Sequence, residues 1–100
     1  MTANDQEKFR EDVFSRVQKI LIGLLKIYRE KKIEDRPQIN WDTDLVNDLG
    51  VDSLEILDLM NALEEEFQIS PNLSEANTKT KIYQVVDYIL SLLARKNAKK

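Results

Sequence analysis

Apolar residues in the first third of the chain recur at steps of three and four, which is the spacing of one face of an α-helix. This stripe is made of Phe9, Val13, Val17, Ile20, Leu21, Leu24, Ile27 and Tyr28. Basic residues occupy the other faces, and Lys31 and Lys32 suit a helix C-terminus. The pattern predicts one amphipathic helix over residues 5–32, with its apolar stripe facing a core.

Two more long helices and a short one are predicted downstream. Residues 53–68 have a broad apolar face, and Pro71 ends the element. Residues 74–78 suit a short helical turn, and residues 81–95 carry another apolar stripe with Thr80 as the N-cap. We expect the tail 96–100 to be frayed. No strand alternation is present, so the prediction is all-α: one domain over residues 1–100, a small bundle of three main helices plus one short helix.

A long loop over residues 33–52 joins the first two helices. Pro37 blocks helix continuation there. Apolar residues are expected to fold the loop back onto the core, namely Ile39, Trp41, Leu45, Val46 and Leu49. The segment does not match a calcium-binding loop that starts at Asp42. Such a loop needs an oxygen ligand, a glycine and a final glutamate at the positions of Val46, Asn47 and Ser53. We therefore predict no metal site.

Two absences in the composition limit the chemistry. The chain has no histidine, so a hydrolase that activates serine through histidine is excluded. It has no cysteine, so any thioester chemistry must take its sulfur from a cofactor. The longest apolar run, residues 20–25, is too short to cross a bilayer, and stable membrane insertion is not expected. The charged N-terminal segment is unlike a signal peptide, which predicts a cytoplasmic location.

The net charge of −3 hides an acidic block in the middle of the chain. Residues 37–78 contain ten Asp and Glu and no Lys or Arg. These acids alternate with apolar residues at helical spacing, which predicts a folded acidic surface rather than a disordered tail. Such a surface attracts basic protein partners and repels nucleic acid, so we expect no nucleic-acid binding. A monomer is expected.

One serine in this block stands at a predicted helix start, in Asp48-Leu49-Gly50-Val51-Asp52-Ser53-Leu54. Gly50 indicates a turn, Asp52 is a good N-cap, and Glu55 stands where a capping box requires an acid. Ser53 is then the first helical residue. Backbone N–H groups and the helix dipole favour an attached anion at that position.

The motif resembles the D-x-L-G-x-D-S-L sequence of the acyl carrier proteins, and the similarity covers about residues 41–89. It implies a carrier and not an enzyme, with a 4′-phosphopantetheine arm on Ser53 and with Asp52 and Gly50 shaping the attachment site. The arm would hold acyl groups as thioesters for fatty acid, polyketide or related lipid biosynthesis. The implied partners are a phosphopantetheinyl transferase and acyl-transferring or acyl-condensing enzymes with basic docking patches.

The resemblance also implies two sets of contact residues. The docking surface for partners would be Glu55, Asp58, Asn61, Glu64 and Glu65, with Asn61 in place of the family's usual apolar residue. The candidate lining of an acyl pocket is Leu45, Leu59, Leu63, Phe67, Ile82 and Val86. Residues 70–81 have one acid and two lysines, unlike the family's acidic third-helix region, which favours a specialised carrier. The alternative is an unmodified acidic helical adaptor that binds basic partners.

Overall fold

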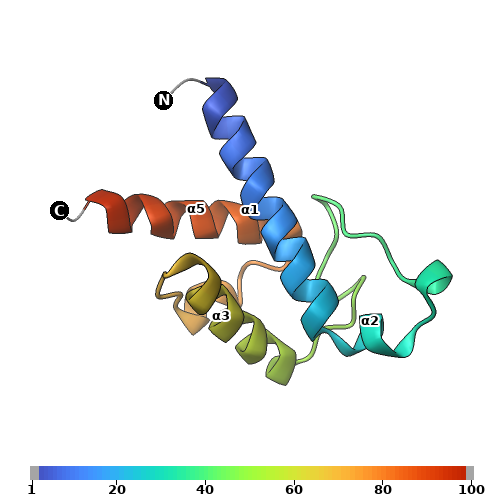
Figure 1. Cartoon of the computed structure of the whole chain (residues 1–100). Helices are drawn as coiled ribbons and strands as arrows, with labels where there is room; N and C mark the ends of the chain where they lie inside the picture. Colours follow the sequence, from blue (N-terminus) through green and yellow to red (C-terminus); the bar gives the residue numbers. More distant parts are fainter. Residues whose placement is uncertain (1–2, 99–100) are drawn as a thin grey trace.

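A computed structural model describes residues 3–98 and confirms the all-α prediction. Three main helices form the bundle: α1 (Ala3–Leu24), α3 (Ser53–Phe67) and α5 (Ile82–Ala98) (Figure 1). Two short α-helices, α2 (Lys26–Glu30) and α4 (Leu73–Ala76), and one 3-10 turn, Ile33–Asp35, lie in the connections. The sequence predicted only one short helix, so α2 is an addition.

The helix predicted over residues 5–32 is interrupted at Leu25, where the expectation was wrong. Leu25 is fully buried but has an extended backbone, with ψ 137°. The next N–H group, on Lys26, donates to Glu55 Oε2 at 3.0 Å. A side chain from α3 therefore satisfies a backbone group at the break. The apolar spacing continues across Leu25, so the hydrophobic pattern contained no sign of the interruption.

Both ends of α5 also differ from expectation. The helix runs to Ala98, so the frayed tail is wrong for residues 96–98, while residues 99 and 100 lie outside the described part. Lys96 Nζ donates to the carbonyl of Gln68 at 2.8 Å, which holds this last turn. At the other end, the Thr80 side chain was predicted to cap the helix. Instead, Gln84 Oε1 accepts the N–H groups of Thr80 and Lys81.

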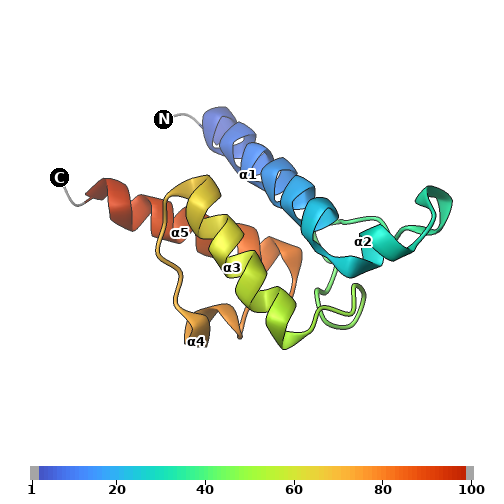
Figure 2. The same ribbon diagram turned by 60° about the horizontal axis from the view of Figure 1, so that its bottom comes forward.

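The core lies where α1 crosses the other two main helices. Side chains with no exposed surface come from α1 and α5 and from the break between α1 and α2, namely Val13, Val17, Leu21, Leu25, Ile82, Val86 and Ile89. The buried residues of α3 are Glu55, Leu59, Leu63 and Phe67. The short helix α4 lies at the edge of the bundle, on the side of α3 away from α1 (Figure 2). The three long helices thus share one core, and α4 covers its margin.

The long loop is anchored at several points to α1 and α5. The Trp41 ring stacks on Phe14 with centroids 4.1 Å apart, and the Arg10 guanidinium lies 4.4 Å from the Trp41 ring. The Trp41 carbonyl accepts the Tyr83 N–H at 2.9 Å. Ile39, Leu45 and Leu49 are buried as expected, but Val46 is 46% exposed and does not join the core. These contacts fix the segment that leads into α3.

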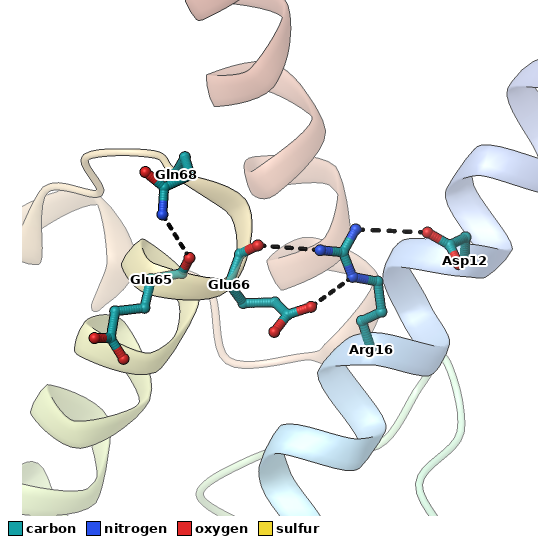
Figure 3. Close-up of polar contacts among 5 residues, drawn as sticks. All are labelled: Asp12, Arg16, Glu65, Glu66 and Gln68. Atoms are coloured by element: carbon teal, nitrogen blue, oxygen red, sulfur yellow. Dashed lines mark hydrogen bonds and ion pairs between the residues drawn. The ribbon is translucent and has the colours of Figure 1, made fainter.

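Arg16 holds the C-terminal end of α3 against α1 (Figure 3). Its Nε donates to Glu66 Oε2 at 2.7 Å, and Nη2 donates to the Glu66 carbonyl at 3.0 Å. The guanidinium also lies 4.3 Å from the centre of the Phe67 ring. Gln68 then takes a left-handed conformation, φ 54°, and its side-chain amide donates to the Glu65 carbonyl. One arginine therefore caps α3 and joins it to α1.

We expect Arg16→Ala to lower the free energy of unfolding by about 1–2 kcal/mol. The substitution removes a charge-assisted hydrogen bond, a helix-end contact and a cation–π contact, all of them partly exposed to water. Urea unfolding would measure the change. The control is Lys19→Ala, an exposed α1 residue without an ion pair in the described part of the chain. Equal midpoints for the two variants would contradict the role of Arg16.

Candidate functional site

The segment before Ser53 is a compact series of turns. Asp44 Oδ1 accepts the N–H groups of Val46 and Asn47, both at 2.9 Å, and Asp48 Oδ2 accepts the Asp44 N–H at 2.8 Å. Gly50 then adopts φ +64°, a conformation that a residue with a Cβ enters only with strain. This glycine redirects the chain into α3.

The capping box predicted at the start of α3 is confirmed. Asp52 Oδ1 accepts the Glu55 N–H at 2.8 Å, and Glu55 Oε1 accepts the Asp52 N–H at 3.3 Å. Ser53 is the first residue of the helix, and its side chain is exposed. Among the side chains that the structure describes, residues 7–96, its hydroxyl has no hydrogen-bond partner. The fold thus presents one unengaged hydroxyl at the N-terminus of a helix of 15 residues.

A lysine from α2 lies beside this position. Lys26 Nζ is 3.1 Å from Asp52 Oδ2. The hydrogen bond from the Glu55 N–H, followed by that from Lys26, lowers the pKa of Asp52 below its ordinary value of 3.8. The hydrogen bond with Asp52 in turn raises the pKa of Lys26. The residue before Ser53 is therefore part of an ion pair that joins α2 to the start of α3.

The lowered pKa of Asp52 has a predictable effect on stability. Because its pKa is lower in the folded state than in the unfolded state, Asp52 stabilises the fold above about pH 4, and this contribution is lost as the pH falls below that value. Asp52→Asn keeps a good N-cap but cannot titrate. We expect the wild-type melting temperature to fall more than that of Asp52→Asn between pH 6 and pH 3. Parallel curves for the two proteins would contradict this account.

The docking expectation needs one correction, at Glu55. This side chain is only 9% exposed, and its carboxylate accepts the N–H groups of Lys26 and Asp52. It is therefore an internal clamp between α2 and α3 rather than a surface acid. The other four residues expected to dock partners are exposed, namely Asp58, Asn61, Glu64 and Glu65.

Two leucines that belong to the broad apolar face predicted for residues 53–68 lie on the surface. Leu54 is 72% exposed and Leu57 is 44% exposed. Helical spacing places them on the same face as Asp58 and Asn61, so this face combines apolar and acidic groups next to Ser53. The spacing to Asn61 was the signal in the sequence that could have identified them.

The structure contains a small apolar cavity of about 40 Å³ between α3, α4 and α5. Three of the predicted pocket residues, Leu45, Leu59 and Leu63, line it. The other three predictions are wrong for this cavity, because Ile82 and Val86 are fully buried in the central core and Phe67 lies under Arg16. The remaining lining residues were not predicted: Ile56, Pro71, Ala76, Lys79, Val85 and Tyr88.

Comparison with known proteins identifies the family. Residues 15–89 match the family described as "Phosphopantetheine attachment site". An acyl carrier protein of Trieres chinensis is 38% identical over 79 residues, which cover 79% of this chain and 90% of the relative. The chain belongs to the acyl carrier protein family. A member from Clostridium acetobutylicum is 38% identical over 77 residues, covering 77% of this chain and 91% of the relative. A mitochondrial one from Neurospora crassa is 34% identical over 82 residues, covering 82% and 57%.

Membership of the acyl carrier protein family defines the type of protein. It is a carrier and not an enzyme, its prosthetic group is covalently bound 4′-phosphopantetheine, and its partners include a phosphopantetheinyl transferase and acyl-handling enzymes. The residues around Ser53 fit that group, because the hydroxyl is exposed, the helix start favours a phosphate and Lys26 is nearby. When bound, the arm supplies the thiol that the chain lacks. None of the helices in the described residues combines the length and the hydropathy that a membrane-spanning segment requires.

Proposed function

We propose that Ser53 carries the 4′-phosphopantetheine arm and that the arm holds acyl groups as thioesters. The observation that supports this most strongly is the unengaged Ser53 hydroxyl at the first position of α3, inside the D-x-L-G-x-D-S-L motif. Gly50 supplies the turn that exposes the serine, and Asp52 fixes the start of the helix. The chain's own contribution is to present and orient the hydroxyl oxygen that forms the phosphodiester.

The cargo is proposed to serve fatty acid, polyketide or related lipid biosynthesis, with this chain acting as a specialised carrier in the cytoplasm. The lysines at positions 79 and 81 and the basic residues that follow α1 over 26–32 support a specialised role, since they change the charge around the bundle.

Partner enzymes are proposed to dock on the face of α3 that follows Ser53. This face presents two exposed leucines, Leu54 and Leu57, together with the acids Asp58, Glu64 and Glu65. A basic patch would be attracted to the acids, while the leucines supply apolar contact area. Because the charges are exposed, binding should weaken as salt is added, and complexes should be short-lived.

Intact-protein mass spectrometry after incubation with coenzyme A and a broad-specificity phosphopantetheinyl transferase tests this function. We expect the mass to increase by one phosphopantetheine. A folded protein that gains no mass but still binds a basic partner would instead support the unmodified adaptor. Circular dichroism of the same sample establishes that the protein is folded.

A further inference from the structure

The apolar cavity and an open outer groove share two residues in their walls, Lys79 and Tyr88, which we call the partition. Lys79 and Tyr88 line the 40 Å³ cavity, and they also line an open groove of about 510 Å³ along α4 and α5. Lys79 lies in the turn after α4, where its N–H donates to the Ala76 carbonyl at 3.0 Å. The cavity and the groove are therefore adjacent and share these two residues in their walls.

The cavity begins close to the attachment site. Ile56, one helical turn after Ser53, contributes to its wall, together with Leu59 and Leu63 further along α3. A volume of 40 Å³ has room for about three water-sized groups. An acyl chain that entered beside Ile56 and was longer than this would approach Lys79 and Tyr88, which line the same cavity.

The phenol of Tyr88 already has its hydrogen-bond partners. Its hydroxyl accepts the Asn72 N–H at 2.8 Å and donates to Glu75 Oε1 at 3.0 Å. This arrangement ties the start of α4 and one carboxylate of the groove to α5. Lys79 is consequently the side chain of the partition whose polar group is available to a ligand.

The cations of the groove have few internal partners. Lys79 is half-buried, and neither Lys79 nor Arg95 has an ion pair within the described residues. The acids of the groove are engaged elsewhere, since Asp87 pairs with Arg10 at 3.1 Å and Glu75 accepts the Tyr88 hydroxyl. The half-buried side chain of Lys79 lines an apolar cavity, so an anion that reaches its ammonium group from the cavity gains an ion pair.

We propose that this carrier is suited to acyl groups whose far end bears a carboxylate, and that Lys79 binds that carboxylate. The methylene part of the cargo contacts Ile56, Leu59 and Leu63, and the terminal carboxylate pairs with the Lys79 ammonium at the partition. An acyl group that ends in a methyl group would reach the same ammonium group without forming an ion pair. This inference rests on the proposed attachment of the arm to Ser53, and it names the cargo class for that site.

The test compares matched cargoes on the intact chain. The apo-protein is loaded with hexanoyl or adipoyl, and with octanoyl or suberoyl, from the coenzyme A thioesters, and each product is verified by mass. Melting temperatures are then measured. We expect the carboxylate-ended member of at least one pair to raise the melting temperature by about 2–5 °C more than its methyl-ended partner. Added salt should reduce the difference.

Two variants make the test specific. Lys79→Met keeps an unbranched side chain of similar length without charge, and it should abolish the preference for the carboxylate. Lys81→Met, an exposed lysine that lines neither the cavity nor the groove, should retain the preference. Equal stabilisation within every pair, or a preference that survives in Lys79→Met, would overturn the inference alone. If none of the four cargoes could be attached to the folded protein, the proposed function would be overturned and this inference with it.

Discussion

Replacing Glu55 with alanine is expected to lower the free energy of unfolding by about 3 kcal/mol, although the residue lies in an acidic motif associated with function. Its carboxylate accepts two backbone N–H groups, from Lys26 at 3.0 Å and from Asp52 at 3.3 Å. Hydrogen bonds to an ionised acceptor contribute about 1.5–3 kcal/mol each, and the side chain is only 9% exposed, so water replaces it poorly. The melting temperature should fall by roughly 10–20 °C.

The matched control for this prediction is Glu64→Ala on the same helix. Glu64 is exposed and makes no hydrogen bond through its side chain within the described residues, so its loss should change stability by less than about 0.5 kcal/mol. Glu55→Gln retains one acceptor oxygen and should be intermediate. If Glu55→Ala and Glu64→Ala unfolded at the same urea concentration, the clamp between α2 and α3 would have no energetic role.

This residue shows where sequence reasoning succeeded and where it stopped. The capping box at Asp52 and Glu55 was predictable, because it depends on contacts within four consecutive residues. The second partner of Glu55, the Lys26 N–H, was not predictable, because it lies 29 residues away and depends on the break at Leu25. A charged side chain in a helix is not necessarily exposed. Glu55 is buried because a backbone N–H group that is distant in the sequence needs an acceptor.

The lining of the cavity was also predictable from the sequence only in part. The apolar stripes of the three main helices correctly indicated most of the buried residues, Ile82 and Val86 among them, although Phe9 is 41% exposed. They did not distinguish residues that line the cavity from residues that fill the core. That difference depends on the rotation of each helix and on Tyr88, which ties α4 to α5 through its hydroxyl. Leu54 and Leu57 were misplaced for a related reason, since an apolar residue near a helix start can face solvent.

Ser53→Ala is expected to abolish the gain of phosphopantetheine completely. The substitution removes the only atom through which the proposed phosphodiester forms at this site. Stability should change by less than about 0.5 kcal/mol, because the hydroxyl is exposed and has no hydrogen-bond partner within the described residues. Loss of modification in a protein of unchanged melting temperature would separate the chemical role of the hydroxyl from any effect on folding.

Ser74→Ala provides the matched control for this substitution. Ser74 is also exposed and also lies near a helix start, in α4, where its N–H donates to Asn72 Oδ1. It lacks the motif around Ser53, and α4 has only four residues. We expect Ser74→Ala to be modified like the wild type. Equal loss of modification in both variants would indicate a general effect on recognition by the transferase.

Direct localisation of the phosphopantetheine is the most decisive measurement. Trypsin should release residues 33–79 as one peptide, because Pro37 blocks cleavage after Arg36; the peptide contains Ser53, Ser70 and Ser74, and its fragmentation assigns the added mass to one of them. The proposed function predicts that the whole added mass is on Ser53. Attachment at Ser70, at Ser74 or outside this peptide would contradict the assignment of Ser53 as the site that carries the arm.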